Sequence, residues 1–435
     1  MSDQQAVTAR DSSTSSSADP DVCPYDFNAT DFDVSSPRHI TDPFDFYRRL
    51  RQQEPVFRSE SLDAHVVTRY ADVRAVFLDH DTFTSVGSLA AAAHLDPEVE
   101  QRLIDNNATL DTFIASVDQP IHTRLRRCVA RSFSVRSMAR LEPDVRALAT
   151  SIVEELEPAG RADLVSEFAA VLPARITARF LGIPLEDTTK VQKWVDDWFG
   201  LFFTPMSAEE QRARAEGYIE YVGYMYRLLQ ERRRQPQEDF MTEVIAAVAE
   251  GSADLNDREI VEIMTAISLG GNDTTGNQIS NLIHRLLVTP GAWEAVVADP
   301  KIHLNAIEES IRLDSAGLGG FRFANEDVEI AGQNVPAGAR IFLLQDAANH
   351  DETVFENPDE YIVDRSNAAE NVGFGVGIHH CLGAPLARME LKVVLGVLTT
   401  ILPSLRLADG SPRTYRVSVV QRAMDSLPVE WDAAP

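Results

Sequence analysis

The segment that decides the fold of this chain is Phe374-Gly375-Val376-Gly377-Ile378-His379-His380-Cys381-Leu382-Gly383. Its three glycines surround one cysteine, and glycine permits positive φ and a close approach of the backbone to a flat ligand. A helix is predicted over residues 384–402, so Cys381 lies just before a helix N-terminus. There the helix dipole and free N–H groups lower the pKa of a thiol. A thiolate held by backbone N–H donors is what an axial iron ligand requires.

A lone cysteine beside a glycine turn is more commonly a buried free thiol, so the argument depends on the full spacing F-G-x-G-x-H-x-C-x-G. Complete in this chain, the pattern resembles the haem-binding signature of the cytochrome P450 family of haem-thiolate monooxygenases. The resemblance implies that Cys381 ligates the iron of haem b, with Phe374 and Gly375 also at the cofactor, and that O2 is a co-substrate. It also implies a fold that is mainly α with minor β, in one large P450-type domain with a long central helix over the haem.

Composition sets the broad class of the protein. The chain has 435 residues, of which 44% are hydrophobic and 25% charged, enough apolar material for a large core. The formal net charge of -27 argues against a nucleic-acid binder, which needs a basic face. The three cysteines are an odd number and lie far apart, which predicts no disulfide framework and fits a reducing compartment.

Neither targeting nor membrane insertion is predicted. No run of about 18 apolar residues occurs, and the Ser- and Asp-rich start of the chain lacks an apolar core. We therefore expect a cytoplasmic protein. Residues 1–24 are predicted to be a disordered tail, and residues 25–435 the haem-thiolate monooxygenase domain.

Hydrophobic periodicity places the main elements. The longest helical pattern covers residues 257–288, with Asp257 as its N-cap and Pro290 just past its end. Residues 86–118 show no clean period and predict a long surface loop with helical pieces. Other predicted elements are a mostly helical stretch at 120–250, a helix at 303–313, short strands at 324–345 and an irregular stretch at 349–372.

The long helix carries Gly270-Gly271-Asn272-Asp273-Thr274-Thr275 at its middle. Each mid-helix glycine costs about 1 kcal/mol relative to alanine, so the pair indicates a kink or a close approach by a ligand. The segment is similar to the family's oxygen-binding motif. The resemblance makes Thr274 the hydroxyl that hydrogen-bonds iron-bound oxygen and Asp273 the gate for proton delivery, and it puts Gly271 beside the haem.

Two further groups of residues match family positions. Glu309 and Arg312 share one helix face at (i, i+3), and the resemblance adds Arg365 as a third partner in a structural cluster that holds the haem loop. An ordinary surface ion pair would show the same spacing. The resemblance assigns four bases, otherwise plausible as solvated surface groups, to the haem propionates: His122, Arg126, Arg322 and His379.

The substrate pocket is predicted from the resemblance alone. Ala316 replaces the usual proline, and residues 316–320 are small, so the pocket wall there is expected to be roomier. His350 replaces a commoner arginine, with little expected effect on the chemistry. The residues assigned to the pocket are apolar, which predicts a small hydrophobic substrate, although they are equally ordinary core by period: Phe113, Phe202, Ile267, Leu318 and Met424.

Electrons are expected from separate proteins, because no cysteine cluster and no glycine-rich nucleotide fingerprint is present. Arg124, Arg127 and Arg131 fall on one helix face, which would suit an acidic ferredoxin supplied by a ferredoxin reductase. A solvated helix face would show the same pattern.

The expected reaction is insertion of one oxygen atom of O2 into the substrate, of the hydroxylation or O-dealkylation type. Three alternatives remain open from the sequence. A peroxide-driven peroxygenase would not need the Asp273-Thr274 relay. A haem-binding sensor or carrier would show no turnover. A non-haem metal site would use His379, His380 and Cys381 as ligands, although the glycine spacing does not present them as a tetrahedral set.

Overall fold

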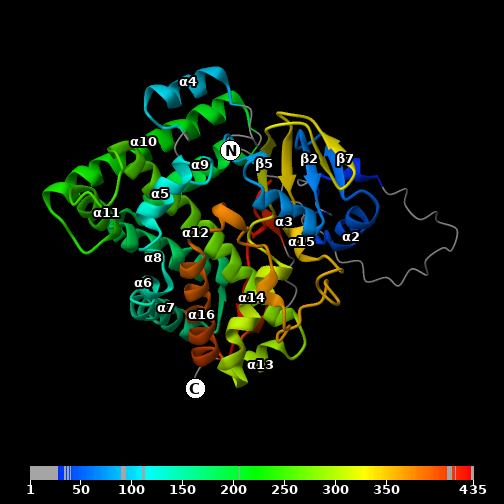
Figure 1. The fold of residues 1–435 in the computed structure, drawn as a ribbon. Coiled ribbons are helices and arrows are strands. Elements are labelled where there is room, and N and C mark those ends of the chain that lie inside the picture. The colour runs from blue at the N-terminus through cyan, green and yellow to red at the C-terminus, as the bar shows by residue number, and fades with distance from the viewer. Residues whose placement is uncertain are drawn as a thin grey trace.

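A computed structural model describes residues 28–33, 36, 39, 41–89, 95–109, 113–204, 206–408, 414–416 and 418–432. The tail predicted for residues 1–24 lies outside the described residues. Figure 1 shows most helices gathered on one side of the molecule and the largest sheet on the other. In the part of the chain that is described, no helix is long and apolar enough to cross a membrane.

Helix α12 (Asp257–Val288) runs through the middle of the helical side (Figure 1). The predicted bounds of this helix are confirmed, but its N-cap is Asn256 and not Asp257. The Asn256 side chain accepts a hydrogen bond from the Glu259 N–H, and the Glu259 carboxylate accepts one from the Asn256 N–H, which forms a capping box. Asp257 instead pairs with Arg233 on the surface. Two adjacent residues could each cap a helix, and the reciprocal bond to Glu259 selects Asn256.

The remaining helices pack around α12 or cover the sheet. Their bounds are α2 Phe44–Gln53, α3 Tyr70–Leu78, α4 Pro97–Asp105, α5 Ile121–Val129, α6 Val135–Met138, α7 Glu142–Leu156, α8 Val171–Leu181, α9 Thr188–Phe203, α10 Ala208–Arg234, α11 Phe240–Ala249, α13 Ala292–Ala298, α14 His303–Leu313, α15 Gln345–Asn349 and α16 Ala384–Ile401. The helices predicted at 303–313 and 384–402 are therefore present, and the segment 86–118 contains the short helix α4.

The strands form one larger sheet and three small ones. The five-stranded sheet has the order β1-β2-β8-β5-β3, in which only β2 and β8 run parallel. The strands predicted from residue 324 onward begin earlier, because β5 starts at Gly320. The strand bounds are β1 Val56–Ser59, β2 Ala64–Val67, β3 Phe83–Thr84, β4 Arg161–Asp163, β5 Gly320–Ala324, β6 Val328–Ile330, β7 Gln333–Val335, β8 Arg340–Leu343, β9 Arg406–Leu407, β10 Tyr415–Arg416, β11 Ala423–Met424 and β12 Pro428–Glu430.

A buried carboxylate anchors the irregular segment 349–372. Glu309 and Arg312 of α14 are fully buried and pair at two points, with Nε–Oε2 2.7 Å and Nη2–Oε1 2.8 Å. The Nε of Arg365 lies 2.9 Å from Oε1 of the same carboxylate. The other N–H groups of the two arginines donate to backbone carbonyls of this segment, those of Asn349, Glu356, Asn357, Pro358 and Glu360. Removing one member would leave a buried charge without its partner, which costs more than a surface pair could.

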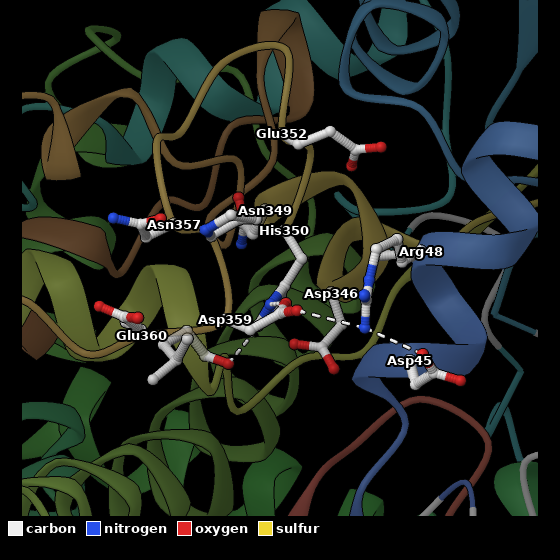
Figure 2. A network of polar contacts seen from close by, with 12 residues as sticks. Asp45, Arg48, Asp346, Asn349, His350, Glu352, Asn357, Asp359 and Glu360 are labelled. Atoms are coloured by element: carbon white, nitrogen blue, oxygen red, sulfur yellow. Dashed lines mark hydrogen bonds and ion pairs between the residues drawn. The ribbon is translucent and has the colours of Figure 1, made fainter.

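His350 extends this network toward α2, as Figure 2 shows. Its Nδ1 lies 2.9 Å from Asp359 Oδ1 and its Nε2 lies 2.9 Å from the Leu313 carbonyl oxygen. Its ring stacks on Phe44, with centroids 4.3 Å apart, and Arg48 approaches Asp359 to 3.9 Å. The position where arginine is commoner thus holds a fully buried ring that joins α2, α14 and the irregular segment.

Glu390 is a buried acid inside α16. Its side chain is fully buried, and neither carboxyl oxygen has a hydrogen-bond partner among the described residues. Burial alone raises the pKa of Glu390 to about 8. The folded protein therefore keeps this group protonated at neutral pH, whereas the unfolded chain does not.

Glu390→Gln is expected to flatten the pH dependence of stability. Below the ordinary glutamate pKa both the folded and the unfolded state hold the proton. As the pH rises toward 8, the unfolded state loses its proton first, and the free energy of unfolding falls by up to about 1.4 kcal/mol per pH unit. Chemical unfolding at pH 5 and pH 8 measures this, with the exposed Glu329→Gln as control. The free energy of unfolding of the variant, relative to that of wild type, should be higher at pH 8 than at pH 5. An equal difference at the two pH values would contradict the assignment.

Candidate active site

The cysteine loop is closed by its own backbone. The Cys381 N–H donates to the Phe374 carbonyl at 2.9 Å, and the Gly375 N–H donates to Val372 at 2.8 Å. Gly375 has φ +66° and Gly377 has φ +78°, a region that side-chain-bearing residues rarely adopt. A Cβ on Gly377 would also lie 2.8 Å from the Phe77 carbonyl oxygen of α3. Both glycines are therefore required by the path of the loop.

The Cys381 sulfur has the surroundings of a stabilised thiolate, but its pKa moves the other way. Backbone N–H groups of Gly383 and Ala384 donate to the sulfur, and the charges of Arg126 and Arg388 also favour the thiolate. Burial outweighs them and raises the pKa of the thiol, so the predicted lowering is wrong for the protein alone. The residue as a whole nonetheless has exposed surface, although protein atoms surround its sulfur.

Basic side chains gather beside this loop. The rings of His122 and His379 lie 4.2 Å apart. Both ring nitrogens of His122 and Nε2 of His379 are buried and have no hydrogen-bond partner among the residues that the structure describes. Burial and the charge of Arg322 lower the pKa of His379 to about 3; burial and the charge of Arg126 lower that of His122 to about 4. Buried bases that repel one another, with unsatisfied nitrogens, suit an anionic ligand.

The two arginines of this group differ in their contacts. Arg322 on β5 is buried, which lowers its pKa to about 10, and its Nη1 donates to the adjacent Phe321 carbonyl at 2.7 Å. Arg126 instead donates from Nη2 to the His380 carbonyl at 2.6 Å, so it also fixes the cysteine loop. The sequence did not show this second role.

Helix α12 has partly exposed surface in the middle of an otherwise buried length. Ile267, Gly270 and Thr274 retain exposed surface there. A Cβ on Gly270 would meet no atom of the described part of the chain within 4 Å, whereas one on Gly271 would lie 2.7 Å from Thr177 Oγ1 of α8. Gly271 lets α8 pack against α12, whereas Gly270 leaves open space, and the expected place of Gly271 beside the haem stays a prediction.

Thr274 and Asp273 lie on α12 within one turn of these glycines. The Thr274 hydroxyl donates to the Gly270 carbonyl at 2.5 Å, a bond to its own helix. The pKa of Asp273 is raised to about 6, first by burial and then by the carboxylate of Asp196, while Arg416 opposes the rise. A carboxyl group with a pKa near neutrality can both hold and release a proton under physiological conditions.

The residues assigned to the pocket are mostly packed against protein. Phe113 stacks on Trp198 with ring centroids 6.1 Å apart, and Phe202 packs against the same tryptophan at 5.4 Å. Leu318 and Met424 are also buried, so among the five assigned residues Ile267 alone keeps partial exposure.

Two observations concern contacts that the sequence left undecided. Arg388 of α16 lies over the Phe374 ring at 4.5 Å and pairs with Glu308 on α14, which joins the cysteine loop to the Glu309 cluster. Its position seven residues after Cys381, two helical turns on, was the only available signal.

Among the described residues, no three His, Cys, Asp or Glu side chains converge on a possible metal position, so the tetrahedral alternative at His379, His380 and Cys381 finds no support.

These features fit haem. A cysteine sulfur with N–H donors, a group of unsatisfied buried bases for two carboxylates, and an open glycine on the long helix match the chemistry of that cofactor. Cys381 would hold the iron, and His122, Arg322 and His379 would bind the carboxylates, with Arg126 beside them.

Comparison with known proteins gives the same answer. The cytochrome P450 family model matches residues 44–408. The chain is 34% identical over 405 residues to vitamin D(3) 25-hydroxylase of Pseudonocardia autotrophica, covering 91% of this chain and 96% of that protein. It is 33% identical over 394 residues to mycinamicin IV hydroxylase/epoxidase of Micromonospora griseorubida, covering 88% and 94%. Cytochrome P450 CREJ, solved with (4-ethylphenyl) dihydrogen phosphate, matches with a TM-score of 0.87 at 31% identity over 90% of this chain and 98% of that one. This chain belongs to the cytochrome P450 family and is a haem-thiolate monooxygenase.

Proposed function

We propose that this monooxygenase oxidises a small hydrophobic substrate, by hydroxylation or O-dealkylation, with electrons from a separate ferredoxin and ferredoxin reductase. The observation that supports the proposal most is the pairing of two features. One is the partly exposed Cys381 beside the unsatisfied buried bases, and the other is the open face of α12 at Gly270 and Thr274. When bound, haem supplies the redox chemistry that activates O2.

The protein's own groups are assigned the proton chemistry. Thr274 donates its only hydroxyl hydrogen to the Gly270 carbonyl, so its oxygen can only accept a hydrogen bond from another group while that bond persists. Rotation about χ1 would release the bond and let the hydroxyl donate elsewhere. Asp273, with a pKa of about 6, can supply the proton that Thr274 passes on.

A hydrophobic substrate is supported by the aromatic side chains of α9. Trp198 contacts Phe113, Phe202 and Phe203, with ring centroids 5.4–6.1 Å apart. Two relatives are named for their action on vitamin D(3) and on mycinamicin IV, so the family scaffold at this level of identity accepts different substrates. The substrate class proposed here therefore rests on the apolar character of α9 and Ile267, not on those names.

A ferredoxin dock is proposed at the C-terminal end of α5, with a smaller patch than the sequence suggested. The helix ends at Val129, so Arg131 lies in the turn that follows it and not on the predicted helix face. Arg127 and Arg131 are exposed. Arg124 pairs with the buried carboxylate of Glu259 and donates to the Asp254 carbonyl at 2.6 Å. Arg124 therefore serves the start of α12, and the proposed patch consists of Arg127 and Arg131.

Thr274→Ala is expected to uncouple electron flow from product. Loss of the hydroxyl removes a proton donor, so product per reducing equivalent should fall about tenfold or more while peroxide release rises. Thr274→Ser should retain coupling, and Thr265→Ala, a buried threonine on the same helix, is the control. A substrate found by its shift of the haem absorption band serves for the assay. Full coupling in Thr274→Ala, with turnover on added peroxide, would favour the peroxygenase alternative instead.

The double charge reversal Arg127→Glu and Arg131→Glu is expected to slow reduction by an acidic ferredoxin about tenfold at low ionic strength. The defect should shrink as salt is added, because screening weakens steering. Stopped-flow reduction measures the rate, with the exposed Arg161→Glu on β4 as a matched control. An unchanged rate at low salt would rule out this face as the dock.

A further inference from the structure

Asp273 lies one turn before Asn277 on α12, so the two side chains share a face of the helix. Arg416 of β10 reaches this face and donates from Nη2 to Asn277 Oδ1 at 3.3 Å. Asn277 is buried and also lies 3.5 Å from Gln421 Oε1, which belongs to the same C-terminal segment. A cation from the end of the chain is thus held one helical turn from the proposed proton donor.

A second carboxylate approaches from the opposite element. Asp196 is on α9, which packs against α12. Its negative charge acts on Asp273, and the positive charge of Arg416 acts on both carboxyl groups. The other charges that face Asp196 are those of Asp197, Arg214 and Lys193. Asp273 is therefore acted on by an anion of α9 and by a cation of β10, in addition to being buried.

We propose that Arg416 and Asp196 are positioning residues for proton delivery by Asp273, with Asn277 holding the Arg416 guanidinium in place. Arg416 attracts the ionised carboxylate, and Asp196 repels it and favours the protonated form. The Asp273 O–H bond breaks as its proton passes to Thr274 Oγ1, and the hydroxyl releases its own proton to the acceptor in the site. The carboxylate is then reprotonated by a hydronium ion of the solvent, which leaves as water, so each transfer breaks one O–H bond and forms one. This inference rests on the proton-delivery role proposed for Asp273.

The two opposed charges would have separate effects on Asp273. Without Arg416, burial and Asp196 would hold Asp273 protonated and slow the release of its proton. Without Asp196, Arg416 would hold the carboxylate ionised and slow its recharging. Proton transfer is most efficient when the pKa of the donor lies near the working pH, and the two charges acting together keep it there.

The direct test is the titration of Asp273 in the substrate-free, haem-loaded enzyme. Infrared difference spectra across a pH series report the protonated carboxyl, and the Asp273→Asn variant assigns its band. Arg416→Gln is expected to raise the midpoint by about one pH unit, and Asp196→Asn to lower it by a similar amount. Arg416→Lys, which keeps the charge, should restore most of the wild-type midpoint. Arg406→Gln, which removes a surface arginine paired with Glu430, should leave it unchanged.

The pH profile of coupling between electron use and product gives the second readout. It should move toward higher pH in Arg416→Gln and lower pH in Asp196→Asn. Unmoved midpoints in both variants would overturn the inference, even if activity falls. If Arg416→Gln does not fold, Asn277→Ala and Asp196→Asn still decide it, the former with a smaller upward shift. If Asp273→Asn itself couples normally, the proposed role of Asp273 fails first, and the inference fails with it.

Discussion

The proposed site depends on holding a negatively charged Cys381 sulfur inside the protein. Ionising the Cys381 thiol in a buried setting is unfavourable, and burial does raise its pKa here. Two backbone N–H groups and the charges of two arginines offset part of that cost without reversing it. A coordinated metal ion deprotonates a thiol outright. We propose that the iron of haem, when bound, supplies the remaining stabilisation.

Much of the surrounding structure serves to hold that loop rigid. Glu309 accepts from two arginines that together fix the carbonyls of an otherwise irregular segment. Arg388 and Arg126 connect the loop itself to α14 and α5. A segment without regular secondary structure can be this well defined because buried guanidinium groups satisfy its carbonyls, as hydrogen-bonded strands would in a sheet.

The parts of the fold that could be predicted are those determined by residues close together in the sequence. Pro290, the apolar period of 257–288 and the glycine loop before α16 gave the bounds of the long helices, and the (i, i+3) spacing gave the Glu309–Arg312 pair. Local signals do not fix helix rotation, so they could not tell that Gly271 packs on Thr177 while Gly270 faces open space. Nor could they show that Arg124 is occupied by Glu259, because that pair joins α5 to α12.

The balance between burial and neighbouring charges at each titratable group also could not be predicted from the sequence. The sign of the Cys381 shift depends on how many atoms surround the sulfur, and the surroundings of Asp273 depend on residues of α9 and β10 that are distant in the chain. The central claim remains the bond between the Cys381 sulfur and haem iron. It is tested most directly by the absorption spectrum of the reduced, carbon-monoxide-treated holoprotein. The account predicts a Soret band displaced to the red in wild type and its loss in Cys381→Ser; an undisplaced band in wild type, or a displaced band that survives the substitution, would contradict it.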